Sequence, residues 1–305
     1  MLAIDIQHLN KVYKNGTVAL QDVSIQVKEG DFYGLLGPNG AGKSTMIGIL
    51  TSLTLKTSGF VSVMGHDIDH DFSKAKACIG VTPQEFNFNG FKKVINVLIE
   101  QAGYYGISSK VARQRGEKYL RQLHLWDKRN SICRSLSGGM KRRLMIARAL
   151  IHEPKILILD EPTAGVDIEI RRSMWQFLKN LNEQGTTIIL TSHYLEEIEL
   201  LCRHVGIIDK GNLITNLPIS DLLTQLDKER FILYVSSYGD LPEIDGYKIE
   251  PIDATTIEVE ISKGQGFNKL FADLESAGIQ VSSLRNKSNR LEELFLRMTG
   301  SGIKE

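Results

Sequence analysis

The sequence contains few cysteines, and this scarcity excludes two kinds of site. Only Cys78, Cys133 and Cys202 occur among 305 residues, and they lie far apart. An odd number of cysteines at such spacing fits neither a disulfide framework nor a zinc-binding pattern. We therefore expect free, buried thiols in a reducing compartment, which favours a cytoplasmic protein.

Long apolar runs are also absent. No stretch approaches the roughly 20 apolar residues that a membrane-spanning helix requires. Runs such as "KILIL" and "TTIIL" have the length of buried strands instead. The opening "MLAIDIQHLNKVYK" alternates between apolar and polar residues like a strand, so we expect no signal peptide. No internal repeat or low-complexity segment is visible.

The chain has no excess of charge of one sign. It contains 37 lysines and arginines against 36 aspartates and glutamates, which gives a formal net charge of +1. Nucleic-acid-binding proteins usually carry a basic excess or stripe, so this balance argues against that class. The densest basic run is 141–143, "KRR", and we expect it to be a solvated helix face.

Apolar periodicity predicts alternating strands and helices over the first 220 residues. The expected strands are 2–6, 23–27, 32–36, a segment within 154–162 that acids and a proline end, and 186–192, followed by a hairpin over 204–214. Helices are expected from Lys43 to about Ser52, over most of 88–152, over 168–183 with Gly185 as C-terminal cap, and over 194–202. This alternation indicates an α/β fold with a mainly parallel sheet that helices cover on both faces.

The pattern changes near residues 217–230. Strand-like segments occupy 230–237, 247–252, 256–262 and 279–286, and helical patterns occupy 266–278 and 290–300. The sequence therefore predicts two domains, residues 1–222 and a small α+β domain over 228–305.

The segment 37–44, "GPNGAGKS", fits the phosphate-loop pattern G-x-x-x-x-G-K-[ST]. It follows a buried strand and precedes a helix, so backbone N–H groups and the helix N-terminus face the same anion. Lys43 supplies a positive charge between the β- and γ-phosphates, and Ser44 offers a hydroxyl to Mg²⁺. We expect the loop to bind ATP through Gly37, Pro38, Asn39, Gly40, Ala41, Gly42, Lys43, Ser44 and Thr45.

Polar residues follow the other expected strands. Asp160 and Glu161 end "ILILDE", and we expect Asp160 to bind Mg²⁺ and Glu161 to orient or deprotonate an attacking water. Two adjacent acids are also common in plain turns. His193, after the next strand, is expected to contact the γ-phosphate, although a lone histidine is more often structural.

Two further residues are weaker candidates. Gln84 lies in "VTPQEF", between the sheet region and the helical segment, where it can reach Mg²⁺ or the attacking water. A surface glutamine is the alternative. Tyr13 is expected to stack on adenine, although most tyrosines serve only in packing.

The ordered set of motifs resembles the ATP-binding subunit of ABC transporters over residues 2–220. It comprises Tyr13, "GPNGAGKST", Gln84, "LSGGM", "ILILDEP", "AGVD" and His193. The resemblance implies a P-loop NTPase cassette: a mainly parallel sheet, an antiparallel β-subdomain, and a helical subdomain inserted at about 86–153. The ending "NKSNRLEELFLRMTG" is similar to that of bacterial drug and polysaccharide exporters of the daunorubicin-pump type, which favours export.

This resemblance also implies partners. Two copies would pair head to tail around two MgATP, with Ser137, Gly138 and Gly139 contacting the γ-phosphate held by the other copy, and Asp167 coupling the two sites. A separate integral-membrane permease would place the pair at the cytoplasmic face of the inner membrane, with no nucleic acid. Met140 departs from the Gln usual in the family, and we expect a small loss of helix capping without loss of ATP contact.

Two alternatives belong to other functional classes. A soluble ABC ATPase acting on ribosomes or nucleic acid usually carries tandem cassettes or a long coiled coil, and this chain has one cassette without sustained heptads. The other alternative is a nucleotide-dependent interaction module without turnover. The presence of both Glu161 and His193 argues against it.

Overall fold

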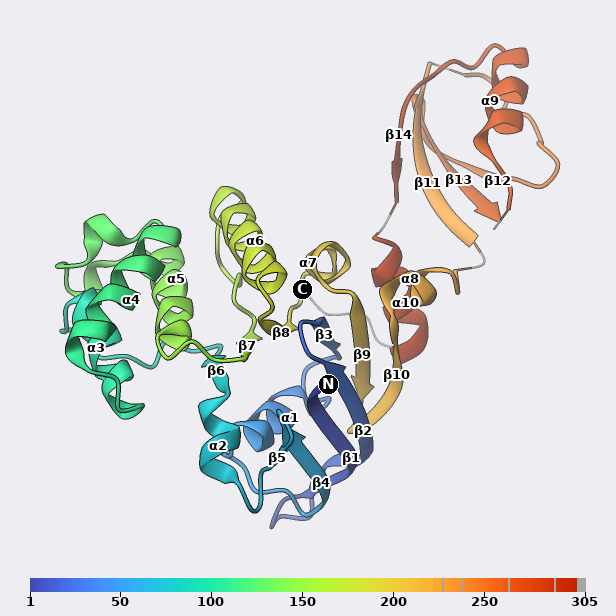
Figure 1. Cartoon of the computed structure of the whole chain (residues 1–305). Helices are drawn as coiled ribbons and strands as arrows, with labels where there is room; N and C mark the ends of the chain where they lie inside the picture. The colour runs from blue at the N-terminus through green and yellow to red at the C-terminus, as the bar shows by residue number, and fades with distance from the viewer. Residues whose placement is uncertain (227, 237, 263, 288, 301–305) are drawn as a thin grey trace. The chain divides into compact units, whose positions relative to one another are not determined.

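The computed structural model describes residues 1–226, 228–236, 238–262, 264–287 and 289–300 (Figure 1). The chain forms two compact units, and the second begins at Ser220. Within the described ranges, no helix has both the length and the apolar character needed to cross a membrane. The three cysteines are free, as predicted, although Cys78 is only partly buried.

A six-stranded sheet forms the centre of the first unit, in the order β10-β9-β3-β8-β7-β6. The strands are β3 (Phe32–Leu36), β6 (Ile79–Thr82), β7 (Ile156–Asp160), β8 (Thr187–Thr191), β9 (His204–Asp209) and β10 (Asn212–Pro218). All pairings are parallel except that of β10 with β9. The mainly parallel sheet predicted from the sequence is therefore confirmed.

The carboxyl ends of four neighbouring strands share one edge of this sheet. Strands β3, β8, β7 and β6 lie side by side and run in the same direction. The register pairs Asp160 with Thr191 and Leu159 with Thr82, so these strands end almost level. The loops that follow them therefore meet at one edge, where open α/β sheets hold their ligands.

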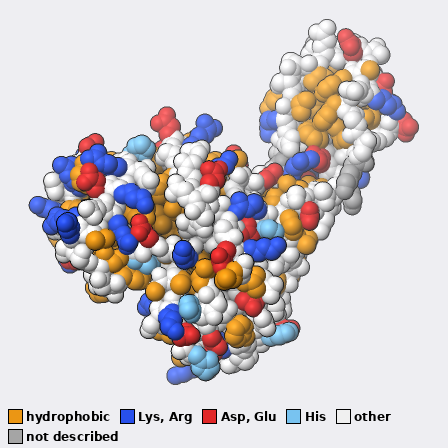
Figure 2. Space-filling view, in the orientation of Figure 1, with side chains coloured by type: hydrophobic (Ala, Val, Ile, Leu, Met, Phe, Trp, Pro, Cys, Tyr) orange, Lys and Arg blue, Asp and Glu red, His pale blue; other side chains and the backbone are white. Residues whose placement is uncertain are grey.

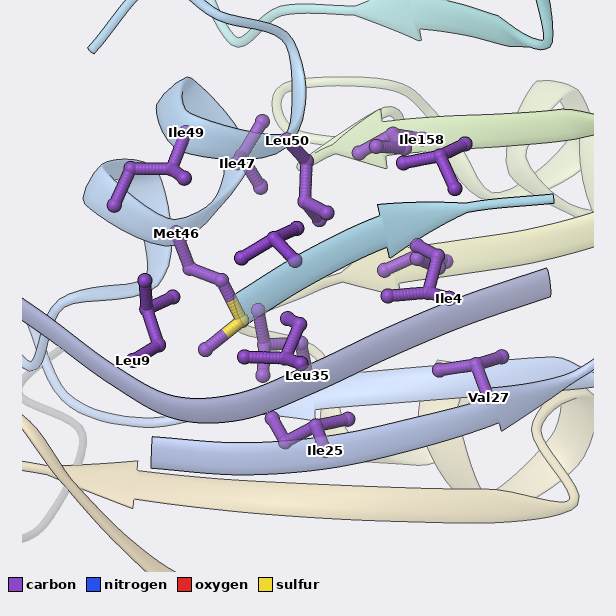
Figure 3. Packing of buried hydrophobic residues seen from close by; sticks show 14 of the residues in the cluster. Ile4, Leu9, Ile25, Val27, Leu35, Met46, Ile47, Ile49, Leu50 and Ile158 are labelled. Atoms are coloured by element: carbon purple, nitrogen blue, oxygen red, sulfur yellow. The ribbon is translucent and has the colours of Figure 1, made fainter. Parts of the chain in front are cut away.

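A second, antiparallel sheet packs beside the first around helix α1 (Lys43–Leu50). Its order is β2-β1-β4-β5, formed by β1 (Leu2–Val12), β2 (Val18–Lys28), β4 (Ser58–Val63) and β5 (His66–Asp67). Figure 3 shows Met46 of α1 lying towards Leu9 of β1 and Leu35 of β3. Because burial of one such side chain stabilises a fold by about 1.5–3 kcal/mol, this core fixes α1 and the loop before it.

The predicted helical segment forms a subdomain of three helices, α3 (Val94–Tyr104), α4 (Ser109–Gln122) and α5 (Gly138–Leu150). Two short 3₁₀ turns, Trp126–Lys128 and Cys133–Ser135, connect α4 to α5, and the short helix α2 (Phe72–Ala77) precedes β6.

Basic and acidic side chains are mixed over the visible face of the first unit (Figure 2). This distribution agrees with the balanced composition.

The remaining helices of the first unit follow the sheet strands. Helix α6 (Ile168–Glu183) begins at Asp167 as N-cap, and Gly185 just past its end has a φ of 98°, as a C-terminal cap requires. Helix α7 (Leu195–Leu201) follows β8. The short helix α8 (Ile219–Leu223) follows β10; it begins at the last residue before the boundary and continues in the second unit. The predicted hairpin of β9 and β10 turns at Lys210 and Gly211, both with positive φ.

The second unit contains an antiparallel sheet of order β12-β13-β11-β14. Its elements are β11 (Lys228–Val235), β12 (Lys248–Asp253), β13 (Thr256–Ser262), α9 (Phe267–Ser276), β14 (Val281–Asn286) and α10 (Arg290–Thr299). Leu233, Ile257 and Val259 pack with Leu270 and Leu274 of α9 in a separate core. The end of the predicted domain, 301–305, lies outside the described residues.

Candidate functional site

The phosphate loop, residues 37–42, connects β3 to α1. Gly42 has a φ of 113°, and a Cβ atom there would lie only 2.6 Å from the Ala19 carbonyl oxygen. Gly40 has a φ of 80°, another conformation that favours glycine. No side chain caps the start of α1 at Gly42. The first amides of the helix therefore remain available to an anion.

Lys43 extends its ammonium group back over the loop. Its Nζ donates to the carbonyl oxygens of Gly37, at 2.5 Å, and Pro38, at 3.1 Å. Burial lowers the pKa of Lys43, and the nearby charges of Glu161 and Asp160 act in the opposite direction. A phosphate in the loop would supply further negative charge and favour the protonated amine.

The two acids after β7 are tied to the end of β8. Thr191 Oγ1 donates to Asp160 Oδ1 at 2.6 Å. The backbone N–H of Glu161 donates to both the carbonyl oxygen and the hydroxyl of Thr191, at 3.1 Å each. These bonds hold Glu161 at a φ of 50°, a strained conformation for a residue with a side chain. Thr191 was not identified from the sequence.

Three loops meet at the carboxylate of Glu161. Gln84 Nε2 donates to Glu161 Oε2 at 2.9 Å, and His193 Nε2 lies 2.6 Å from Glu161 Oε1. The Glu161 side chain is 11% exposed. The loops after β6, β7 and β8 thus bring the three predicted catalytic residues into direct contact. A carboxylate fixed in this way can accept a proton from a water molecule beside it.

A cavity of about 500 Å³ lies between the phosphate loop and these residues. It is lined by Tyr13, Thr17, Val18, Ala19, Asn39, Gly40, Ala41, Gly42, Lys43, Ser44, Thr45, Gln84, Asp160, Glu161 and His193. The volume is within the usual range for a small-molecule site. Tyr13 Oη lies 3.2 Å from Thr45 Oγ1, and Lys11 Nζ lies over the Tyr13 ring.

The donor set in this cavity suits Mg²⁺ bound together with phosphates. Ser44, Gln84 and Asp160 all line it and offer oxygen atoms, which are the ligands that Mg²⁺ prefers. Within the described ranges, no cluster of three or more His, Cys, Asp or Glu side chains forms a dedicated metal cage. One carboxylate with substrate phosphates is the usual arrangement for Mg²⁺ in nucleotide enzymes.

The glycine segment, Ser137–Gly139, begins α5 and is not among the residues that line this cavity. Ser137 is the N-cap, and its Oγ accepts from the Met140 N–H at 3.3 Å. A Cβ atom on Gly138 would meet no atom within 4 Å, whereas one on Gly139 would lie 3.2 Å from Ile170 Cδ1. Gly139 therefore allows close packing against α6, and Gly138 faces open space.

Asp167 also lies outside the cavity lining. Its Oδ1 accepts from the Ile170 N–H at 2.9 Å, so its carboxylate caps α6 within this chain. The segment that ends at Asp167, residues 161–167, is called the acid loop below, because it begins with Glu161. The prediction that Asp167 couples two sites stays a prediction.

The expectation that 141–143 is a solvated face is wrong for its two arginines. Arg142 and Arg143 are only 7% and 8% exposed. Arg142 Nη1 donates to the carbonyl oxygens of Pro83 and Gln84, and Arg143 Nη1 donates to that of Leu123 at 2.9 Å. Backbone carbonyls thus replace water at one terminal nitrogen of each guanidinium group. Arg142 joins the helix of the glycine segment to Gln84, a role that residue type alone does not reveal.

The comparisons agree with this geometry. The ABC transporter family matches residues 20–164. The chain is 33% identical over 317 residues to the linearmycin resistance ATP-binding protein LnrL of Bacillus subtilis (strain 168), with 99% of this chain and 100% of that protein covered. It is 39% identical over 304 residues to the Nod factor export ATP-binding protein I of Burkholderia pseudomallei (strain 1710b), with 97% of each chain covered.

A solved structure has a similar fold. It is a dimeric ATP-binding cassette, MJ0796, in a post-hydrolysis state with bound ADP and Pi. The TM-score is 0.65 at 29% identity, and the match covers 71% of this chain and 98% of that one.

Proposed function

This chain belongs to the ABC transporter family as an ATP-binding subunit, and from this premise we propose that two copies pair head to tail and hydrolyse ATP to drive export. The observation that carries the proposal is the Glu161 carboxylate, held between Gln84 and His193 beside the phosphate loop. Phosphoryl transfer requires that the attacking water be positioned in this way and that the charge of the phosphates be neutralised.

Each polar residue of the cavity has a separate task. Glu161 orients or deprotonates the attacking water, and His193 holds Glu161 on one side while reaching the γ-phosphate on the other. Lys43 and the amides of the phosphate loop bind the phosphates, and Tyr13 contacts adenine. Mg²⁺, when bound, neutralises phosphate charge, and Ser44, Asp160 and Gln84 are the residues that would hold it.

The glycine segment serves the ATP of the other copy. Two observations support this assignment: the segment lies outside the cavity of its own chain, and Gly138 faces open space at a helix N-terminus. Free amides and the positive end of the helix dipole there suit a phosphate that a second copy brings. Asp167, at the end of the acid loop, would run along the same interface.

The pair would act on a separate integral-membrane permease at the cytoplasmic face of the membrane. The relatives support export, because their names describe resistance and Nod factor export. An ATPase acting on ribosomes or nucleic acid is not favoured. The division into a nucleotide-binding domain, 1–222, and an accessory domain, 228–305, belongs to this proposal.

Trans-complementation between two inactive variants tests the shared site. Lys43→Ala removes the phosphate-loop cation, and Gly138→Asp places a negative charge in open space without an internal clash. A mixed pair combines both defects in one site and leaves the other site intact. Because half of the pairs in a random 1:1 mixture are mixed, we expect about a quarter of wild-type phosphate release.

Each variant alone serves as the control and should release little phosphate at an ATP concentration well below the weakened Kd of Lys43→Ala. If the mixture is as inactive as the separate variants while both still form pairs, each chain uses its own glycine segment. Retained activity of Gly138→Asp alone would also contradict the shared site.

Arg142 provides a prediction with a matched control in the next residue. We expect Arg142→Met to lower kcat by about tenfold, because Gln84 loses the charge-assisted bonds that fix its backbone beside Glu161. Arg143→Met removes an equally buried arginine whose guanidinium donates to the Leu123 carbonyl oxygen and not to Gln84. It should lower the unfolding temperature with kcat within about twofold. Equal losses of kcat would mean that burial, and not the contact with Gln84, explains the effect.

A further inference from the structure

Glu197 of α7 is a fully buried carboxylate, with 0% of the residue exposed. We propose that Glu197 is a positioning residue that locks the acid loop, residues 161–167, to the histidine loop, residues 192–194. The inference rests on the proposed roles of Glu161 and His193, because Glu161 begins the acid loop and His193 lies in the histidine loop.

Each of the two loops donates a hydroxyl to this carboxylate. Thr163 Oγ1, two residues after Glu161, lies 3.2 Å from Glu197 Oε1 and 3.0 Å from Oε2. Ser192 Oγ, in the residue before His193, donates to Oε2 at 2.5 Å. The third donor is Trp175 Nε1 of α6, at 2.7 Å from Oε1. Glu197 therefore binds one side chain from each loop and one from a helix that belongs to neither.

A second contact joins the same two loops. Arg171 of α6 donates from Nη2 to the carbonyl oxygen of Val166 at 3.4 Å, in the acid loop. Its guanidinium carbon lies 3.9 Å from the centroid of the Tyr194 ring, in the histidine loop. Burial raises the pKa of Glu197, and the three hydrogen bonds and the charge of Arg171 act against that rise.

The chemistry of a carboxylate explains why this contact couples the loops. An ionised carboxylate only accepts hydrogen bonds, so Thr163, Ser192 and Trp175 must all point their hydrogens at it. Movement of either loop away from Glu197 removes a hydrogen bond from a buried carboxylate that water does not reach, which is costly in a dry environment. The loops therefore move together, and the position of His193 follows that of Glu161 and Asp167.

Removal of the donors one at a time tests the inference in the full chain. Thr163→Val and Ser192→Ala each detach one loop from Glu197, whereas Trp175→Phe removes a donor from the same carboxylate and leaves both loops attached to it. We expect the first two to lower kcat about tenfold, with KM for ATP within about twofold of wild type. Trp175→Phe should lower the unfolding temperature and keep kcat within about twofold. Thr163→Ser, which keeps the hydroxyl, should restore kcat.

The double variant Thr163→Val/Ser192→Ala should lose no more than about the larger single loss, because either substitution already breaks the link through Glu197. The inference is overturned if Trp175→Phe loses as much kcat as the loop variants, or if the loop variants match wild type. Parallel assays of Glu161→Gln and His193→Ala separate the proposed function from the role of Glu197. If both of these retain turnover, the proposed function fails; if both are inactive while the loop variants are normal, only the role of Glu197 fails.

Discussion

We expect Glu161→Gln to abolish ATP turnover and to lower kcat at least about 100-fold. Glutamine has the shape of glutamate and can still accept a hydrogen bond from Gln84, but its amide cannot take a proton from water. The variant also removes a negative charge beside the phosphate loop, so ATP binding should be kept or strengthened. Phosphate release measures the loss, and size-exclusion chromatography with ATP should show a pair that no longer separates.

Glu196→Gln is the matched control for this experiment. Glu196 lies in the first turn of α7 and is exposed, so its neutralisation changes the net charge by the same amount without touching the cavity. It should leave kcat within about twofold of wild type. Turnover near wild type in Glu161→Gln would remove Glu161 from the catalytic role, whatever its contacts with Gln84 and His193.

The backbone at Glu161 makes the variant informative. Its φ of 50° is strained for any residue with a Cβ atom, and the two bonds to Thr191 hold it there. Glutamine meets the same restriction as glutamate, so the substitution changes the chemistry of the side chain and not the local conformation. A loss of kcat at unchanged thermal stability therefore reports on the carboxylate itself.

The edge of the sheet that carries the site was predictable from the sequence. Strands β3, β7 and β8 are short apolar runs followed by polar residues, and all three are buried along their length except at Asp160. Because parallel strands end at a common edge, the sequence pattern alone places Lys43, Glu161 and His193 near one another. The direct contacts among Gln84, Glu161 and His193 do not follow from that pattern, because they depend on the paths of three separate loops.

The segment between residues 53 and 82 was not predictable in the same way. Strand β6 has four residues, β5 has two, and β4 contains a glycine with a φ of 98°. Such short elements have little periodicity of their own. They form because β4 pairs with β1 and β6 pairs with β7, which are contacts between distant parts of the chain.

The burial of charged side chains is the other feature that could not be predicted from residue type. Arg142 and Glu197 both belong to charged stretches of helix, "KRR" and "LEEIE", that look like solvated faces. Arg142 is buried because the carbonyls of Pro83 and Gln84 accept its hydrogens, and Glu197 because Thr163, Trp175 and Ser192 supply donors. These partners come from distant parts of the chain, so no local sequence pattern predicts them.

We expect Lys43→Ala to weaken ATP binding by about 10- to 100-fold. This loss corresponds to a free energy of about 1.5–3 kcal/mol, the usual contribution of a hydrogen bond to a charged group. The amides of the phosphate loop remain, so binding is weakened and not lost. Lys56→Ala is the control, because Lys56 is also largely buried and donates to the Gly59 carbonyl oxygen and to Asp69, away from the cavity. It should lower stability without changing the Kd for ATP.

The pH dependence of the Kd distinguishes loss of charge from loss of packing at Lys43. Burial lowers the pKa of this amine in the nucleotide-free chain, so its charge is lost at a lower pH than that of a solvated lysine. Wild-type affinity should therefore fall as the pH rises through that pKa, and the affinity of Lys43→Ala should not show this fall. An unchanged Kd in Lys43→Ala, or parallel pH profiles in the two proteins, would mean that the loop amides bind the phosphates without help from the ammonium group.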